Sequence, residues 1–288
     1  MKFLVIGDLH GNKPKIIGND FDCIIAPGDF CSDKPRKYMF ESMRRSMKNK
    51  KDSIEWYEIC GKKKAKEMIK KSLKDGRKIL EYLNSFDVPV FALPGNWDWT
   101  GDKGKWKFKK NNFWKTYLIK DLKNIKDCHK KVRKWKGVSF VGHGETSSPE
   151  KPTKETLEHL DKKEIRKKER KYSKIMKFMN KKFKESKSPL IFLTHNVPYN
   201  TKLDKIDNSS SPMHGKHMGS YVARELINNY QPLICIGGHM HETFGKTRIK
   251  KTLCINAGFG SDVLTTFEIK GGKVKNLKFL ENGKVVKK

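Results

Sequence analysis

Long apolar segments are missing from this sequence of 288 residues. No apolar run approaches the roughly 18–20 residues that a membrane-spanning helix needs, so we expect no membrane partner. The first apolar run, residues 3–6, is too short for the core of a secretory signal peptide. The six cysteines are widely spaced and form no C-x-x-C pair, which argues against a zinc ribbon or a disulfide framework. We therefore expect reduced thiols and a cytoplasmic location.

Acidic residues are scarce relative to basic ones. The 64 Lys and Arg stand against 32 Asp and Glu, for a formal charge of +32. Residues 31–85, 101–136 and 151–187 carry 17, 14 and 15 basic residues but only 8, 3 and 6 acidic ones. This excess favours an anionic substrate or partner. A solvated helix surface, or the composition of an AT-rich or heat-adapted genome, explains the same excess and stays open.

Short apolar runs dominate the nearly neutral remainder, and they are typical of buried strands in an α/β protein. The runs are residues 2–6, 23–26, 90–93, 138–141, 190–193, 233–236, 253–256, 265–269 and 274–279. Apolar residues at helical spacing predict helices over residues 67–83, 164–183 and 221–227.

The organisation of the chain favours a single domain. The sequence has no internal repeat, and no linker rich in Pro, Gly and Ser divides it. We expect one domain over residues 1–288, in which residues 31–85, 101–136 and 151–187 are basic insertions of helix and loop.

Five polar motifs directly follow predicted strands. They are Gly7-Asp8-Leu9-His10-Gly11-Asn12, Gly28-Asp29, Gly95-Asn96-Trp97-Asp98, Thr194-His195-Asn196 and Gly238-His239-Met240-His241-Glu242. Ligands of open α/β folds bind at the carboxyl ends of strands, so these motifs predict one shared site. A sixth motif, Gly142-His143-Gly144, is weaker.

The motif side chains form a donor set suited to transition metals. The candidate metal ligands are Asp8, His10, Asp29, Asn96, His195, His239 and His241. Four imidazoles are too many for a Mg²⁺ or Ca²⁺ site, and the lack of thiolates argues against a structural zinc. The set suits Mn²⁺, our first choice, and also Fe, Zn²⁺, Co²⁺ or Ni²⁺.

Seven donors exceed what one ion needs, so we expect two divalent ions. Their charge, less that of Asp8 and Asp29, leaves an excess of +2 that matches a phosphate group. Asp8 and His10 alternate along a predicted extended segment, as do His239 and His241, so each pair is expected to point the same way.

The order of these motifs resembles the calcineurin-like metallophosphoesterase superfamily, and in particular its small, single-domain prokaryotic and archaeal branch. The tail adds matches at residues 199–204, 217–220, 224, 238–242 and 255–258. The resemblance covers residues 1–30, 86–100 and 137–150 well and most of 188–288, but not the bulk of the basic segments. It implies an α/β fold, a four-layer α-β-β-α sandwich of two mixed β-sheets flanked by helices.

The resemblance also implies roles for the site residues. Asp8, His10, Asp29 and His241 would hold one ion, and Asp29 would bridge to a second ion held with Asn96, His195 and His239. The implied activity is a dinuclear metal-dependent phosphoesterase, in which a hydroxide bridging the metals hydrolyses a phosphomono- or phosphodiester bond. The implied partner is an anionic phosphate ester.

One position departs from the common pattern. Many relatives have His where Trp97 stands, and an indole N–H cannot give up its proton usefully. Either the leaving group needs no acid, or another group supplies the proton; His217 and His143 are the candidates among the side chains. The candidate catalytic residues are Asn96, Asp98 and His217, and the candidate substrate-binding residues are Asn96, His217 and Arg224.

Simpler explanations exist for several of these residues. His217 could cap or pack the helix that starts near Ser220, and Arg224 could lie on the surface of that helix. Trp97 and Trp99 could stack on a ring of the substrate or form a wall of the pocket, and we favour the second role.

Two other functions stay open. The Lys-rich segments carry interleaved aromatic residues at Trp56, Trp106, Phe113, Trp114 and Trp135, as in proteins that hold phosphates and stack bases. The chain could therefore be a nucleic-acid-binding protein with a vestigial site, or a metal-dependent nuclease. A scaffold that binds metal without turnover is a further alternative. The intact ligand set favours the enzyme.

Overall fold

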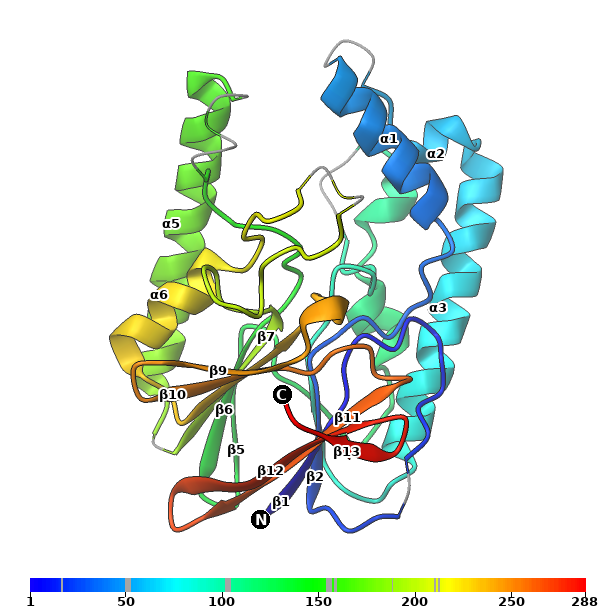
Figure 1. Cartoon of the computed structure of the whole chain (residues 1–288). Helices are drawn as coiled ribbons and strands as arrows, with labels where there is room; N and C mark the ends of the chain where they lie inside the picture. Colours follow the sequence, from blue (N-terminus) through cyan, green and yellow to red (C-terminus); the bar gives the residue numbers. More distant parts are fainter. Residues whose placement is uncertain are drawn as a thin grey trace.

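Two mixed β-sheets pack face to face and helices cover their outer faces (Figure 1). The computed structural model describes residues 1–16, 18–49, 53–101, 105–153, 157, 160–187, 189–209, 211 and 213–288. The expected four-layer sandwich of two mixed sheets is confirmed. Parts of the three predicted insertions, namely residues 50–52, 102–104, 154–156 and 158–159, lie outside the described residues, and the single-domain organisation stays a prediction.

One sheet has seven strands in the described part of the chain. They are β1 (Lys2–Val5), β2 (Cys23–Ala26), β3 (Val90–Ala92), β4 (Ile125–Asp127), β11 (Val263–Lys270), β12 (Lys273–Glu281) and β13 (Lys284–Val286). Their order is β13-β12-β11-β1-β2-β3-β4. Neighbours from β1 to β4 are parallel, whereas β11, β12 and β13 add antiparallel pairs.

The other sheet has six strands by the same description. They are β5 (Val132–Trp135), β6 (Val138–His143), β7 (Leu190–Asn196), β8 (Ile234–Gly238), β9 (Gly245–Ile249) and β10 (Thr252–Asn256). Their order is β5-β6-β7-β8-β10-β9, with β6, β7, β8 and β10 parallel and an antiparallel strand at each edge.

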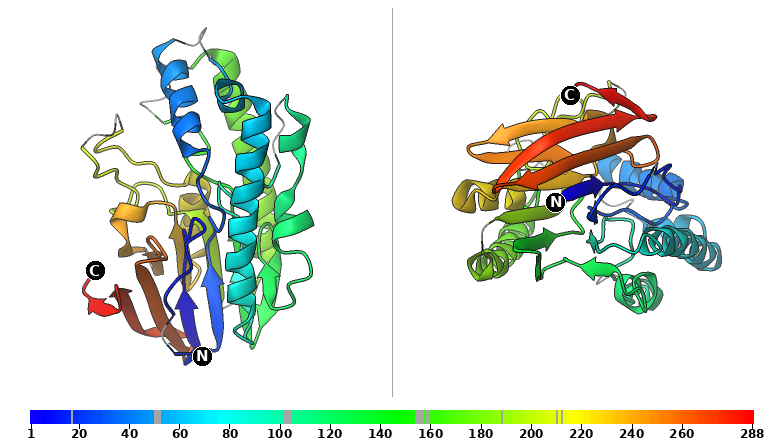
Figure 2. Two further views of the ribbon diagram at one scale, coloured as in Figure 1. Left: turned by 90° about the vertical axis from the view of Figure 1, so that its right-hand side faces the viewer. Right: turned by 90° about the horizontal axis from the view of Figure 1, so that it is seen from below.

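Helices form the two outer layers. They are α1 (Arg36–Lys48), α2 (Trp56–Ile59), α3 (Lys62–Asn84), α5 (Lys162–Glu185) and α6 (Tyr221–Tyr230), with the short turns η2 (Lys107–Lys110), η3 (Trp114–Leu118) and η4 (His241–Thr243). On α3, Ile69 packs in one cluster with Leu4 of β1. On α5, Phe183 packs with Phe192 of β7, so α3 and α5 cover opposite sheets (Figure 2). No helix among the described residues has the length and apolar character needed to cross a membrane.

Aromatic rings fill the space between the sheets. Phe91 of β3 stacks on Phe140 of β6 with ring centroids 3.7 Å apart, and Phe3 stacks on Phe267 at 4.6 Å. Side chains alternate across each strand, so Phe3 faces this inner core while Leu4 faces α3. The inner core thereby ties the two sheets together and fixes the relative position of their strand ends.

The sequence predicts the central strands and the main helices correctly. All nine predicted runs are strands, and the three predicted helices are α3, α5 and α6. It misses β4, β5, β9 and β13, and two of these, β4 and β5, lie in a segment expected to be helix and loop. Each of the four is a sheet edge. Edge strands are short and carry charged residues, as in Val-Arg-Lys-Trp of β5, so they lack the continuous apolar run of a central strand.

Candidate metal centre

The predicted metal ligands meet where the parallel strands of both sheets end. Asp8 and His10 follow β1, Asp29 follows β2 and Asn96 follows β3. The other sheet contributes three histidines: His195 near the end of β7, His239 just after β8, and His241 at the start of η4. The seven residues thus lie at the ends of five strands. Asp8 and His241 are 233 positions apart in the sequence.

The described side chains form two groups that could each hold an ion. Asp8, His10 and His241 each offer a ligand atom, and these atoms lie within 4.8 Å of one another. Asp29, His195 and His239 form a second group by the same measure.

Asp29 lies between the two groups. Its Oδ2 is 3.7 Å from Nε2 of His10 and 3.3 Å from Nε2 of His195. Nε2 of His195 also lies 2.8 Å from Oδ1 of Asn96, which brings the amide into the second group. Nε2 of His10 lies 3.2 Å from Nε2 of His241. The arrangement is therefore one continuous centre rather than two separate clusters.

The backbone at this centre is not extended, contrary to the sequence prediction. Asp8, His10, Asp29 and His239 have φ angles of 52°, 46°, 59° and 69°. A left-handed conformation is costly for residues with a Cβ and is often found at functional sites. It also separates His239 from His241: the two histidines were expected to point the same way, yet they belong to different groups.

Two glycines let the loops approach the carboxylates closely. A Cβ on Gly95 would lie 2.1 Å from Oδ1 of Asp29, and a Cβ on Gly238 would lie 2.1 Å from Oδ2 of Asp8. Both separations are far below van der Waals contact. Gly95 and Gly238 are thus explained by the space that the two carboxylates occupy.

Asp98 belongs to neither donor group, and its carboxylate accepts hydrogen bonds from the backbone. It is fully buried, and it accepts hydrogen bonds from the backbone N–H groups of Asp29, Phe30, Cys31 and Gly95 at 2.8–3.0 Å. Burial, and then the charge of Asp29, raise the pKa of Asp98 to about 6, although these N–H donors oppose the shift. Asp98 therefore holds the loop after β2 against the loop after β3.

The histidines of the second group differ in charge. Burial lowers the pKa of His195, but the Asp29 carboxylate outweighs it and raises that pKa to about 9. Burial and then the charge of His195 lower the pKa of His239 to about 4. Burial alone would raise the pKa of Asp29, yet His195 holds it below its usual value. His239 is thus neutral at pH 7, whereas His195 must release a proton when it binds a cation.

Unsatisfied buried atoms indicate that the centre fits a metal. Oδ1 of Asp8, Oδ2 of Asp29 and Nδ1 of His10 are buried and make no hydrogen bond among the described residues. Buried polar atoms without a partner are rare in folded proteins and call for an explanation, such as a bound ion. The two carboxylate oxygens belong to different groups, and a cation in each group would satisfy both.

Two aromatic rings border the first group. Trp97 meets His10 edge-on with centroids 6.3 Å apart, and its backbone N–H donates to Oδ1 of Asp29 at 2.8 Å. Phe259 stacks on His10 at 6.0 Å and lies 5.3 Å from His241. Both residues are half-buried.

His217 is held by the buried carboxylate of Asp204. Its Nδ1 lies 2.8 Å from Oδ1 of Asp204, which is fully buried. The neighbouring Met218 carbonyl accepts from the side-chain amide of Asn196 at 2.8 Å, and this contact ties the His217 loop to the residue after His195. His217 thus does not cap α6; the Ser220 hydroxyl does, accepting from the backbone N–H of Ala223.

The structure shows Arg224 and His143 in contact with other residues of the chain. One guanidinium nitrogen of Arg224 donates to the carbonyls of Tyr199 and Asn200 at 3.3 and 3.1 Å, so it supports that loop. His143 is buried, and its Nε2 lies 3.3 Å from Oε1 of Glu150.

Glu150 is a structural residue that the sequence analysis missed. It accepts from the Ser220 hydroxyl at 2.6 Å and from the backbone N–H of Tyr221 at 2.8 Å, at the start of α6. Burial alone would raise the pKa of Glu150, but the hydrogen bond with His143 helps to lower it below its usual value. Its only sequence signal was its place after a run of Ser and Pro, which is typical of loops.

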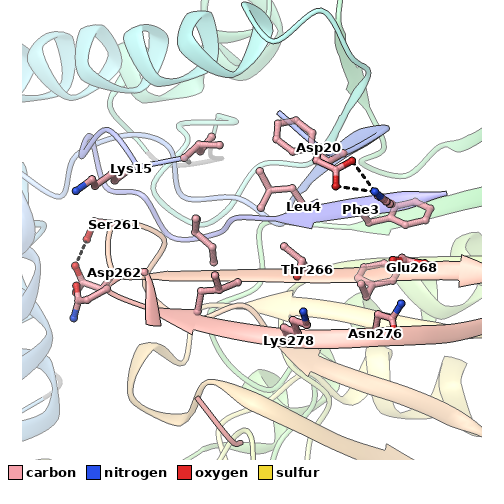
Figure 3. Close-up of a pocket in the computed structure, with 18 residues that line it drawn as sticks. Phe3, Leu4, Lys15, Asp20, Ser261, Asp262, Thr266, Glu268, Asn276 and Lys278 are labelled. Carbon is pink, nitrogen blue, oxygen red and sulfur yellow. Dashed lines mark hydrogen bonds and ion pairs between the residues drawn. The ribbon is translucent and has the colours of Figure 1, made fainter. Parts of the chain in front are cut away.

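A cavity of about 690 Å³ lies elsewhere, on the outer face of β1, β11 and β12 (Figure 3). Lys15 and Asp20, from the loop before β2, stand on one side of it, and Lys278 of β12 stands on another. None of its lining residues is a predicted site residue.

Comparisons with known proteins bear on the family and the fold. A family model described as calcineurin-like phosphoesterase matches residues 1–243. No curated protein matches the sequence. One crystal structure has a TM-score of 0.60 at 16% identity and covers 97% of this chain and 98% of its own. Phosphopantetheinyl hydrolase from Mycobacterium tuberculosis has a TM-score of 0.52 at 11% identity over 90% of each chain. At these identities the two structures show a shared fold.

Proposed function

Since this chain belongs to the calcineurin-like phosphoesterase family and is a hydrolase of phosphate esters, we propose that it works with two divalent metal ions held by the candidate centre. The observation that carries the proposal is the pair of three-residue donor groups joined at Asp29, with an unsatisfied carboxylate oxygen in each. Mn²⁺ is the first choice, and the imidazole-rich set also suits Fe, Zn²⁺, Co²⁺ or Ni²⁺.

Each donor has a proposed place. Asp8, His10 and His241 would hold one ion and His195, His239 and Asn96 the other, with Asp29 shared between them. Two bound ions would polarise the phosphate oxygens and supply a nucleophile from water near neutral pH. Because only two carboxylates are among the seven donors, the loaded centre would keep an excess of +2 for the anionic ester. The substrate would be a phosphomono- or phosphodiester.

Metal dependence is the direct test of this proposal. Protein treated with a chelator should hydrolyse neither p-nitrophenyl phosphate nor bis(p-nitrophenyl) phosphate, and added Mn²⁺ should restore hydrolysis of at least one of them. The reason is that the unloaded centre lacks the positive charge that stabilises the developing negative charge on phosphate. Release of p-nitrophenolate measures the rate. Activity that survives complete metal removal would contradict the proposal.

We also propose that His217 protonates the leaving oxygen, which Trp97 cannot do because its indole N–H does not give up its proton. Asp204 fixes the ring through Nδ1, which leaves Nε2 as the group to face the ester. Replacing His217 by Ala should slow hydrolysis of esters with basic leaving groups by about 10²-fold or more, and of p-nitrophenyl esters much less, because a good leaving group needs no acid.

Steady-state rates over a series of aryl esters measure this difference. His214→Ala is the control, since His214 is exposed and lies three residues from His217 in the same loop. An equal loss for good and poor leaving groups would argue against the acid role and for one in substrate binding.

Two features of the chain extend the proposal. Its six cysteines are free, which favours a reducing compartment, and we place the enzyme in the cytoplasm. We also treat residues 1–288 as one domain, because the inner core draws residues from both sheets and from both ends of the sequence.

A further inference from the structure

Helix α5 is longer than the sheet that it covers. Its 24 residues span about 36 Å, whereas the seven residues of β7 span only about 23 Å. Its buried side chains, Met176, Met179 and Phe183, all lie in its second half. Residues 162–171, the first part of the helix, have no buried side chain, and Figure 1 shows this part rising beyond the ends of the strands. We call residues 162–171 the α5 arm.

The α5 arm concentrates positive charge. It holds seven basic residues and two acidic ones, and none of the seven forms an ion pair with a described residue. Like charges recur at the i,i+4 spacing, for example Lys163 with Lys167 and Arg166 with Arg170. Such pairs weaken an isolated helix. A helix that keeps this pattern, with no buried side chain to support it, fits a partner that supplies negative charge.

Helix α1 forms a second arm. It begins seven residues after Asp29, and none of its described side chains is buried. It carries five basic residues and one acidic residue, and Lys37, Arg44 and Lys48 are in no ion pair with a described residue. Figure 1 and the left view of Figure 2 show α1 and the α5 arm rising beyond the same end of the two sheets. That end also holds the candidate metal centre.

Although the sequence favoured Trp97 as a wall of the pocket, the structure places the half-buried Trp97 and Phe259 beside His10 of the metal centre, and two such rings favour an unpaired strand over a duplex. Aromatic side chains that line a phosphate-binding surface stack on bases, and only unpaired bases are free to stack on a protein. We propose that α1 and the α5 arm hold a single strand of nucleic acid across the candidate metal centre, whose substrate is then a phosphodiester of that strand. This inference rests on the proposed function and names its substrate class.

A membrane surface fits the α5 arm less well. Helices that lie on anionic membranes bury an apolar face as well as presenting basic residues. The α5 arm has a single aliphatic residue, Ile165, among its ten positions. A small phosphate ester fits less well too, because it would need none of the charge that both helices carry beyond the strand ends.

Binding by the metal-free protein tests the inference without relying on turnover. The probe is a fluorescein-labelled thymidine oligonucleotide of about 20 residues, measured by anisotropy between about 50 and 200 mM salt. We compare wild type with the arm variant Lys163→Gln, Arg166→Gln, Lys167→Gln and Arg170→Gln. The matched control is Lys273→Gln, Lys275→Gln, Lys284→Gln and Lys287→Gln, four exposed lysines on β12, β13 and the chain end.

We expect the arm variant to bind the strand at least about tenfold more weakly, with a salt slope smaller by roughly 3, and the control to change less than about twofold. An A·T duplex should bind more weakly than the single strand. With Mn²⁺, wild type and both variants should hydrolyse bis(p-nitrophenyl) phosphate at similar rates.

Four results would overturn the inference: no strand binding at low salt, an equal loss in both variants, equal affinity for duplex, or tighter binding to phosphatidylserine vesicles than to the strand. Hydrolysis of the small diester in any of these cases leaves the proposed function standing. Failure to hydrolyse the small esters counts against the proposed function and the substrate class that rests on it, but not against strand binding by the two helices, since binding is measured without metal.

Discussion

Replacing Asp29 by Asn should reduce kcat/KM for the preferred p-nitrophenyl ester on the order of 10³-fold or more. Asp29 has ligand-atom contacts to both donor groups, at 3.7 Å to Nε2 of His10 and 3.3 Å to Nε2 of His195. An amide of the same size has one fewer anionic oxygen to share between two ions. It also removes the charge that holds His195 in place. We therefore expect a bound-metal content below two ions per chain, measured by elemental analysis of the purified protein.

Asp20→Asn is the matched control for charge. Asp20 has a side chain that is 85% exposed and pairs with Lys2 at the start of β1, the end opposite to the candidate centre, so its neutralisation should leave the rate unchanged. A variant at Asp29 that kept more than about a tenth of wild-type activity would show that the two groups do not act through this carboxylate.

Replacing Asp98 by Ala should lower the free energy of unfolding of the metal-free protein by about 3–5 kcal/mol. Four backbone N–H groups would lose their acceptor inside a fully buried site. Asp98→Asn should cost less, because its amide oxygen still accepts from two of the four while its NH₂ group faces the other two. Urea denaturation with an unchanged m-value measures both changes.

The control for this prediction is Asp87→Ala. Asp87 is exposed, and its loss should change stability by no more than about 0.5 kcal/mol. If Asp98→Ala cost less than about 1 kcal/mol, Asp98 would not be the residue that joins the loops after β2 and β3.

The position of the candidate centre follows from local sequence signals. A buried strand is short and apolar, and a polar motif at its end is easily found, as with Cys23–Ala26 and Asp29. Parallel strands bring such ends together, so convergence needs no knowledge of long-range contacts. The same logic fails at edge strands such as β9, where Gly-Lys-Thr-Arg-Ile has one polar face and no continuous apolar run.

Backbone conformation at the centre was not predictable in this way. Asp8 and His10 alternate as strand residues do, yet both adopt left-handed φ angles. Tertiary contacts impose them: the backbone N–H of Asp8 donates to the carbonyl of Gly28, and that of His10 donates to the carbonyl of Asp29. These hydrogen-bond partners lie 19 or more positions away, so the local residue pattern does not reveal them. Three of the four donors to Asp98 were hidden for the same reason, because Asp29, Phe30 and Cys31 are 67–69 positions away.

The α5 arm has a consequence for how this enzyme can evolve. Because residues 162–171 contribute no buried side chain to the core, whole helical turns can be added to or removed from that end without opening a void in the molecule. Selection can then alter the reach of the helix while the strand ends that carry the chemistry stay as they are. Descendants of one ancestor could in this way diverge in what they cleave without having to refold.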